Sequence, residues 1–215
     1  MLLVFSKTTG YRHSSIKEGS ATIGRLATEH HVGVDFTEDS SLFTPANLAR
    51  YSAVIFLNTT GTILDDEQKA AFEGYIHAGG GYVGVHSAAD TEYQWAWYDK
   101  LVGTHFKHHP QIAQATVNVE DHSHPSTSML PTKWVRTDEW YDFLSNPRDH
   151  VHVLLTLDES TYAGGLMGAD HPIAWYHDFE GGRSWYTGMG HTAQSYSEPL
   201  FEAHLWGGIA YAAGF

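Results

Sequence analysis

Apolar runs alternate with helix-like stretches through the first half of the chain. Four of these runs predict buried strands, at residues 2–5, 32–36, 53–57 and 82–85. Between the first two runs, Ile16, Ile23 and Leu26 recur at helical spacing. Before the fourth run, acidic residues from Asp65 onward open a helix that Gly79–Gly81 would stop. Strands that alternate with helices in this way predict a parallel sheet with helices on both faces.

The second half of the chain is β-rich and less regular. Strand-like runs occupy residues 116–119, 133–143, 151–157, 173–179 and 184–187. A closing helix is predicted from about Ser197, with Pro199 in its first turn, and His204 on this helix is expected at the surface or in a cap. The chain has no internal repeat, no low-complexity tract and no linker-like boundary. This organisation predicts one domain over residues 1–215.

Composition and charge exclude several classes of function. The chain has 42% hydrophobic and 17% charged residues, which is typical of a globular protein. Its formal net charge of −13 repels phosphate backbones and anionic lipids, so neither nucleic acid nor a membrane is expected as a partner. The absence of cysteine excludes disulfides, thiolate metal sites and thiol catalysis. Composition leaves the location open between the cytoplasm and, for a domain of a longer secreted protein, the outside of the cell.

The most distinctive segment of the sequence runs from Gly79 to Asp90. Three glycines precede a short apolar strand, and the chain then turns onto small residues at His86–Ala89. A strand that feeds a tight turn into a helix is where α/β enzymes expose a nucleophile. The tip of this predicted turn is His86, so an imidazole stands where a thiol or hydroxyl would be. We expect His86 to be a functional, exposed side chain at the carboxyl end of the fourth strand.

Polar side chains also follow the other predicted strands. His13 lies shortly after the first strand, Asn58 and Thr59 lie directly after the third, and Asp90 lies just beyond the elbow. Ligands of open α/β sheets bind at the carboxyl ends of the strands, so these residues are candidates for substrate binding. Asn and Thr are also common in turns and caps, so Asn58 and Thr59 are equally open to a structural role.

Sixteen histidines are unusual in a chain of 215 residues. His105, His108 and His109 form a group beyond the elbow that can supply metal ligands or a base, or form a solvated turn. His191 follows a glycine pair near the last strand, and with His86 and a carboxylate it can hold a divalent metal ion or form an acid–base pair. The candidate metal ligands are His86, His109 and His191. No nucleotide cofactor is expected.

The run Asp138–Tyr141 places two acids beside two aromatic rings. Alternation along a strand sends Glu139 and Tyr141 to one face and Asp138 and Trp140 to the other. A carboxylate beside apolar rings is desolvated, which predicts a raised pKa for Glu139 and a role in proton transfer. The alternative is an edge strand with solvated acids.

Aromatic rings also crowd residues 93–98, just after the elbow. Flat rings next to amides and carboxylates suit the apolar face and the hydroxyl rim of a sugar. Trp95, Trp140 and Tyr141 are therefore candidates for contact with a carbohydrate.

A series of short segments occurs along the whole chain in a specific order and spacing. They are Thr9–Ser14, Asn58–Gly61, Gly79–His86, Phe106–Pro110, His124–Pro125, Asp138–Tyr141, His171–Trp175 and Gly182–Thr192. In these segments the chain resembles the ThuA-like (trehalose utilisation) family. The resemblance implies an α/β, flavodoxin-like fold similar to that of class I glutamine amidotransferases, with a mostly parallel sheet and helices on both faces. It also implies a role with carbohydrates, either a disaccharide or an oxidised (keto) sugar.

The residues and the resemblance together support more than one function. The first hypothesis is an enzyme acting on a sugar that carries a carbonyl, as a keto-glycoside hydrolase or lyase or as a sugar isomerase. His86 or His191 would act as base or metal ligand, and Glu139 would shuttle the proton. The alternatives are a non-catalytic carbohydrate-binding domain of a larger sugar-active protein and an interaction domain without a ligand. The expected partners are a small-molecule carbohydrate and, in a longer chain, other sugar-active domains.

Overall fold

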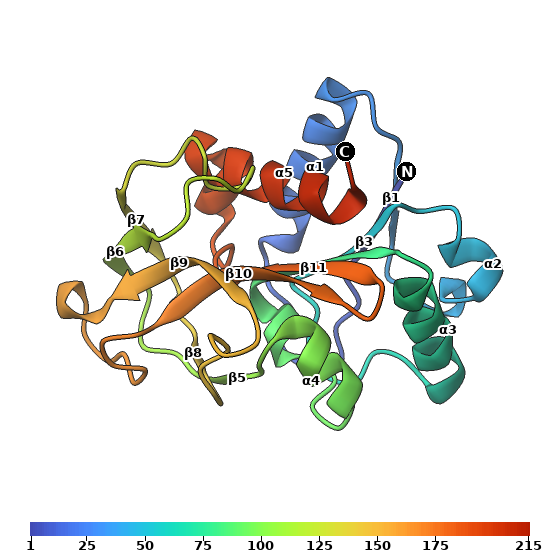
Figure 1. Ribbon diagram of the computed structural model, residues 1–215, viewed down its shortest axis with the longest axis horizontal. Coiled ribbons are helices and arrows are strands. Elements are labelled where there is room, and N and C mark those ends of the chain that lie inside the picture. Colours follow the sequence, from blue (N-terminus) through green and yellow to red (C-terminus); the bar gives the residue numbers. More distant parts are fainter.

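The computed structural model describes residues 1–215 as a nine-stranded sheet, a two-stranded sheet and the helices around them (Figure 1). The strands of the large sheet are β1 (Leu2–Phe5), β2 (Val34–Thr37), β3 (Ala53–Leu57), β4 (Gly81–Val85), β6 (Ala113–Val119), β7 (Lys133–Asp138), β9 (His152–Asp158), β10 (Pro172–Phe179) and β11 (Gly182–Thr187). The small sheet consists of β5 (Phe106–His108) and β8 (Asp142–Phe143). The helices are α1 (Ile16–Glu29), α2 (Pro45–Leu48), α3 (Asp66–His77), α4 (Ala96–Val102) and α5 (Pro199–Ala213).

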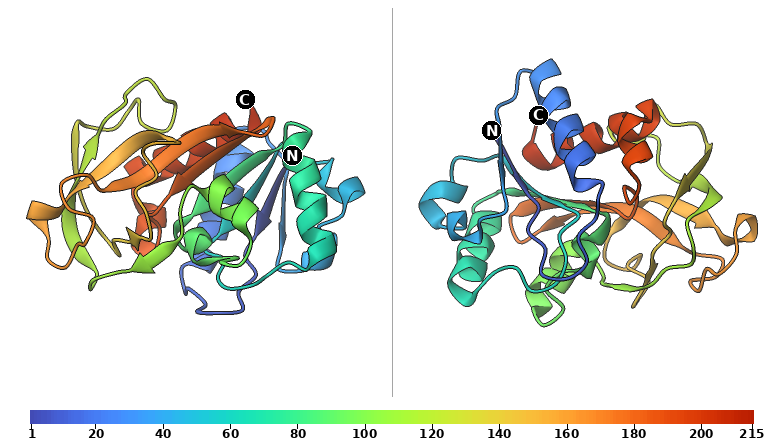
Figure 2. Two further views of the ribbon diagram at one scale, coloured as in Figure 1. Left: turned by 60° about the horizontal axis from the view of Figure 1, so that its bottom comes forward. Right: turned by 180° about the vertical axis from the view of Figure 1, so that it is seen from behind.

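The strands of the large sheet follow the order β2-β1-β3-β4-β11-β10-β9-β6-β7. Strands β2, β1, β3, β4 and β11 are parallel, and β10, β9, β6 and β7 extend the sheet through antiparallel pairs. Helices α1 and α5 cover one face of the parallel part, and α3 and α4 cover the other (Figures 1 and 2). The predicted α/β fold with a largely parallel, helix-covered sheet is confirmed.

The local sequence explains most of these elements. Strands β1, β3 and β4 are wholly buried, because each is a continuous apolar run between two layers of helices. Helix α3 begins with a capping box in which Asp65 and Gln68 bond reciprocally. The strand predicted over residues 133–143 is wrong in its extent: it ends at Asp138, whose carboxylate accepts the N–H of Glu139 and draws the chain out of the ladder.

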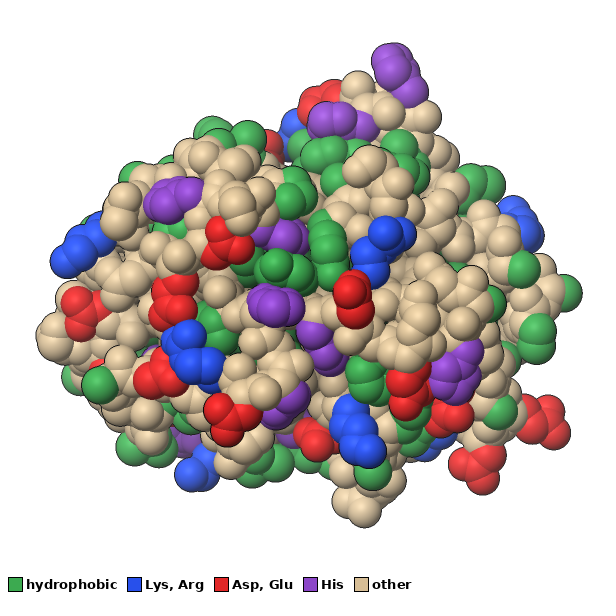
Figure 3. Space-filling model, in the orientation of Figure 1, with side chains coloured by type: hydrophobic (Ala, Val, Ile, Leu, Met, Phe, Trp, Pro, Cys, Tyr) green, Lys and Arg blue, Asp and Glu red, His purple; other side chains and the backbone are tan.

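None of the helices combines the length and the apolar character that crossing a bilayer requires. Figure 3 shows one face of the molecule, where acidic and basic side chains are interspersed and no broad basic patch is seen.

Several histidines are structural, and His204 on α5 is the clearest example. Contrary to the expectation of a surface position, its side chain is fully buried. Its Nδ1–H donates to Ser126 O at 2.9 Å, and its Nε2 lies 3.2 Å from Thr187 Oγ1, so the ring is satisfied as a neutral imidazole. Burial lowers the pKa of His204 to about 3 and that of His124 to about 4.

We expect the free energy of unfolding to decrease as the pH falls below about 6.5, because the unfolded chain then binds protons that His204 and His124 exclude in the folded state. A fully buried histidine contributes up to ~1.4 kcal/mol per pH unit in this range. Urea titrations between about pH 7.5 and about pH 5.5 measure the slope. His204→Gln should reduce the slope by about one proton, and His122→Gln, at an exposed position, should leave it unchanged. An equal slope in both variants would contradict the prediction.

Candidate functional site

The candidate site lies at the carboxyl ends of β1, β3, β4 and β11. The loops after β3 and β4 are tied together where the Gly61 N–H donates to Asp90 O at 2.9 Å. Strand β7 runs in the same direction as β11, because the antiparallel pairs between them restore the direction. Its end at Asp138 therefore reaches the same edge of the sheet, and Glu139 follows it into the site.

His86 occupies the tight turn at the end of β4, as predicted. Its φ of 50° lies in the left-handed region, which few residues other than glycine adopt. The expectation of an exposed side chain is wrong: its exposed fraction is 0%. The rings of Tyr141, His13 and His191 cover it, with centres 4.2, 4.9 and 5.0 Å away. Its Nδ1 lies 2.8 Å from Gly188 O, so Nδ1–H donates to the carbonyl. Nε2 is then the ring nitrogen that can accept a hydrogen bond or bind a metal ion.

The side chains of His86, His191 and Glu139 converge on one point. His191 Nδ1 lies 3.0 Å from His86 Nε2 and 3.0 Å from Glu139 Oε2. The distance between His86 Nε2 and Glu139 Oε2 is 3.4 Å. His13 completes the group, since the ligand atoms of all four residues lie within 4.8 Å of one another. Loops that follow four different strands thus bring three imidazoles and one carboxylate together.

Burial and neighbouring charges set the protonation of this group. Burial by itself would raise the pKa of Glu139, but hydrogen bonds and charges from His191 and His86 outweigh it and lower the pKa below its usual range. The raised pKa predicted from the aromatic neighbours is therefore wrong. Burial lowers the pKa of His13 to about 3, and the charges of His86 and His191 act in the same direction. Near neutral pH the group presents a carboxylate and, at His13, a neutral imidazole.

This donor set is suited to a divalent metal ion. Zinc binds imidazole nitrogen and carboxylate oxygen at about 2.0–2.2 Å in a tetrahedron, whose corners are about 3.4 Å apart. The distances of 3.0 to 3.4 Å among His86, His191 and Glu139 are close to that spacing. The Nδ1 of His13 lies 3.3 Å from Ser87 Oγ, an outer contact of the kind that orients metal-bound histidines.

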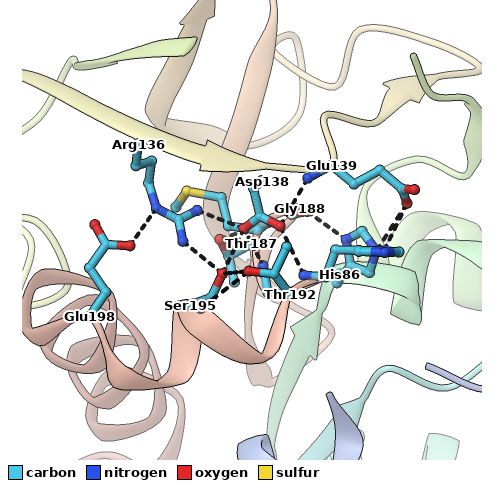
Figure 4. Close-up of polar contacts among 12 residues, drawn as sticks. His86, Arg136, Asp138, Glu139, Thr187, Gly188, Thr192, Ser195 and Glu198 are labelled. Atoms are coloured by element: carbon cyan, nitrogen blue, oxygen red, sulfur yellow. Dashed lines mark hydrogen bonds and ion pairs between the residues drawn. The ribbon is translucent and has the colours of Figure 1, made fainter. Parts of the chain in front are cut away.

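Asp138 anchors the backbone of the group (Figure 4). Its carboxylate is fully buried and lies 2.7 Å from Arg136 Nη1. Its Oδ1 accepts the backbone N–H of Glu139 at 3.0 Å and that of His191 at 3.1 Å. Its Oδ2 accepts the N–H of Gly190 at 2.8 Å. Figure 4 shows the Glu139 side chain leading away from Asp138, so one buried carboxylate fixes the backbone positions of two members of the group.

A cleft of about 460 Å³ opens in front of these side chains. It is lined by Tyr11, His13, Asp90, Phe106, His109, Glu139, Tyr141 and His191. The volume is in the range of small-molecule sites, and aromatic rings with a few polar groups are the typical lining. Neither Lys nor Arg lines the cleft, so its chemistry does not favour an anionic ligand.

The polar residues at the end of β3 lie outside the cleft. Asn58 is fully buried and donates from Nδ2 to Ser15 Oγ at 3.0 Å and to Gly190 O at 3.2 Å. Thr59 is also buried, and its hydroxyl lies 2.9 Å from Thr91 Oγ1. Both residues connect the loops beneath the site, which matches their structural interpretation rather than direct contact with a substrate.

Two of the predicted aromatic contacts also point elsewhere. Trp95 precedes α4, and its indole N–H donates to Glu73 at 2.9 Å, away from the cleft. Trp140 is fully buried, and its indole N–H donates to Ala113 O at 2.8 Å. The cleft instead takes its rings from Tyr141, which was predicted, and from Tyr11 and Phe106, which were not. Tyr11 and Phe106 belong to two of the family-like segments, but nothing in the sequence separates them from the other aromatic residues.

The histidines beyond the elbow have separate surroundings. His105 is buried, and His108 lies on the outside with its Nδ1 3.1 Å from Asp142 Oδ2. His109, interpreted from the sequence as a metal ligand, lies outside the four-residue group. Its Nδ1 is 3.1 Å from Glu139 Oε1, the carboxylate oxygen that does not face His86 and His191.

Comparison with known proteins gives a consistent assignment. A family model described as "ThuA: Trehalose utilisation" matches residues 1–212. A solved structure described as a ThuA-like protein from Bacteroides uniformis has a TM-score of 0.85 at 25% identity, over 98% of this chain and 90% of that chain. A second, described as ThuA-like and from Parabacteroides merdae, has a TM-score of 0.78 at 21% identity, over 99% and 89%.

More distant structures share the fold alone. A β-galactosidase from Bacillus circulans has a TM-score of 0.64 at 13% identity, over 99% of this chain but 31% of that chain. No curated protein is significantly similar to the chain. The family model and the ThuA-like structures agree over nearly the whole length, and the chain belongs to the ThuA family, whose description is trehalose utilisation.

Proposed function

We propose that this protein is an enzyme acting on a sugar that carries a ring carbonyl, and that it removes the proton from the carbon next to that carbonyl with loss of the glycosidic substituent. The observation that carries the proposal is the convergence of His13, His86, His191 and Glu139 behind a small-molecule cleft. The family description, trehalose utilisation, supports a carbohydrate as the substrate. The aromatic rings of Tyr11, Phe106 and Tyr141 in the cleft suit the apolar face of a pyranose.

A divalent metal ion held by these four residues would polarise the carbonyl oxygen and stabilise the negative charge that develops on it. The protein supplies the hydrogen bonds to the sugar and the base. Asp90, which lines the cleft, can accept hydrogen bonds from sugar hydroxyls. A base removes the proton, the C–H electron pair forms a double bond to the anomeric carbon, and the bond to the glycosidic oxygen breaks. The departing oxygen takes up a proton, so the step is an elimination without oxidation or reduction.

The structure also weighs against a domain that only binds sugar. A carboxylate such as that of Glu139 is costly to bury unless it is paired. Recognition of sugar hydroxyls does not need three imidazoles around one carboxylate. Such clusters of titratable groups in a cleft are typical of catalytic sites.

A methyl 3-keto-glucoside tests the proposal. With the zinc-loaded protein in D2O, we expect methanol release and hydrogen exchange at the carbon next to the carbonyl, both followed by NMR. Glu139→Gln should lower both rates by about 100-fold or more, because it removes a charge from the centre of the group. Glu120→Gln, which alters an exposed pair with Arg148, is the matched control. Binding of the sugar without exchange or bond cleavage would instead identify a carbohydrate-binding domain.

A further inference from the structure

His109 stands apart from the four buried side chains, on the open side of the cleft. Its side chain is 45% exposed, whereas that of Glu139 is 9% exposed. The two oxygens of Glu139 face in different directions: Oε2 lies 3.0 Å from His191 Nδ1, and Oε1 lies 3.1 Å from His109 Nδ1. Glu139 therefore separates an inner set of imidazoles from one outer imidazole.

The hydrogen bonds of His109 determine which of its nitrogens is free. Its Nδ1 lies 3.1 Å from Glu139 Oε1 and 2.9 Å from Pro110 O. Both partners accept hydrogen bonds, so Nδ1 carries the proton and Nε2 of the neutral ring is an unprotonated acceptor. The ring is also held by Phe106 and Tyr141, whose ring centres lie 5.9 and 6.2 Å away in stacked orientations. A carboxylate that holds Nδ1–H and leaves Nε2 free is the arrangement of general-base histidines.

The inner imidazoles are poorly placed for the same task. His86 has no exposed surface, and the exposed fraction of His13 is 5%. Both belong to the set of ligand atoms that lie within 4.8 Å of one another, where a metal ion would occupy their free nitrogens. His13 and His191 also line the cleft, but both belong to that set, whereas His109 lines the cleft and lies outside it.

From this geometry we propose that His109 is the catalytic base of the reaction, and not a metal ligand. The inference rests on the proposed function. Nε2 of His109 takes the proton from the carbon next to the carbonyl, and the C–H electron pair becomes the new carbon–carbon double bond. The imidazolium is stabilised by Glu139 Oε1 and returns the proton to the departing glycosidic oxygen. At the end of the reaction, Nε2 of His109 is thus unprotonated again.

His108 provides a matched control one residue away. It is exposed like His109, but its Nδ1 faces Asp142 and it does not line the cleft. With the methyl 3-keto-glucoside and the zinc-loaded protein, His109→Gln should lower hydrogen exchange by about 100-fold or more. Zinc should still bind this variant at one ion per chain, with an affinity loss of no more than about 10- to 100-fold, because His109 is an outer contact of Glu139 and no inner ligand is removed. His108→Gln should retain both exchange and zinc binding.

Chemical rescue separates a catalytic from a structural role. His109→Gly leaves space at an exposed position, so added imidazole should restore part of its exchange rate, with a dependence on imidazole concentration and pH. Loss of zinc binding in His109→Gln would make His109 a ligand and overturn the inference. Wild-type exchange in His109→Gln would also overturn it while leaving the proposed function intact. A wild-type protein that neither exchanges nor cleaves the keto-glucoside would overturn the proposed function itself.

Discussion

Replacement of His191 by Gln is expected to weaken zinc binding by more than about 100-fold, the upper end of what outer contacts of metal ligands contribute. His191 Nδ1 is the atom that lies 3.0 Å from both His86 Nε2 and Glu139 Oε2, so its loss opens the centre of the donor set. Isothermal titration calorimetry of the purified protein with Zn²⁺ measures the effect, with one ion expected per wild-type chain. His122→Gln, at an exposed position, should bind zinc like the wild type.

The protonation of the group favours this binding. His13 has a pKa lowered to about 3 and Glu139 a pKa below its usual range, so neither must lose a proton before a metal ion binds near neutral pH. His13 and Glu139 therefore release no protons when a metal ion binds, and this can be checked by titrating in buffers of different ionisation enthalpy.

A second cluster provides a sharp comparison. Asp142, Glu159 and His171 also lie within 4.8 Å of one another. There, however, Glu159 Oε1 already accepts the Met167 N–H at 2.8 Å, and Asp142 Oδ1 accepts the Leu166 N–H at 2.8 Å. These groups are satisfied by the protein, so His171→Gln should retain the zinc ion. Zinc lost from His171→Gln but kept by His191→Gln would place the metal in the second cluster and contradict the prediction.

The sequence predicts β1, β3 and β4 because each is a continuous apolar run followed by a helix. For the same reason the position of His86 at the end of β4 is predictable: a local pattern of glycines, strand and turn determines it. Glu139 and Tyr141 line the cleft while Trp140 is buried, as the alternation predicted, although the strand that it assumed ends at Asp138.

Long-range packing determines what the sequence does not predict. Glu139 has a lowered pKa because the end of β7 meets the loop after β11, and this contact depends on antiparallel strands between them whose order is not apparent locally. Burial likewise assigns Asn58 and Trp140 to structural roles, although their residue types and positions suit a binding site. The choice between a ligand and a base for His109 depends on which oxygen of Glu139 it faces, a matter of side-chain geometry alone.

Asp138→Asn is expected to destabilise the folded protein by about 3–5 kcal/mol, because it breaks a fully buried ion pair and leaves the buried Arg136 with only the part-exposed Glu198 as a charged partner. The side chains of Arg136 and Asp138 are 2% and 0% exposed, and the amide nitrogen of Asn would face N–H groups that the carboxylate now accepts from Glu139, His191 or Gly190. Urea unfolding measures the loss. Glu198→Gln is the matched control: it touches the same Arg136 from a position that is 29% exposed, so it should cost under about 1 kcal/mol.

Asp138→Asn should also lose zinc affinity, since Asp138 holds the backbone of both Glu139 and His191. The loss of stability in Asp138→Asn should be independent of pH in the neutral range. Burial would raise the pKa of Asp138, but Arg136, His86 and the Gly190 N–H together lower it, so its stabilising contribution persists above the unfolded pKa of about 3.9 and is lost only as the pH falls through the lower folded value. A variant that unfolds like the wild type and binds zinc normally would show that the backbone on either side of Asp138 is fixed by other contacts, and that this carboxylate does not position the site.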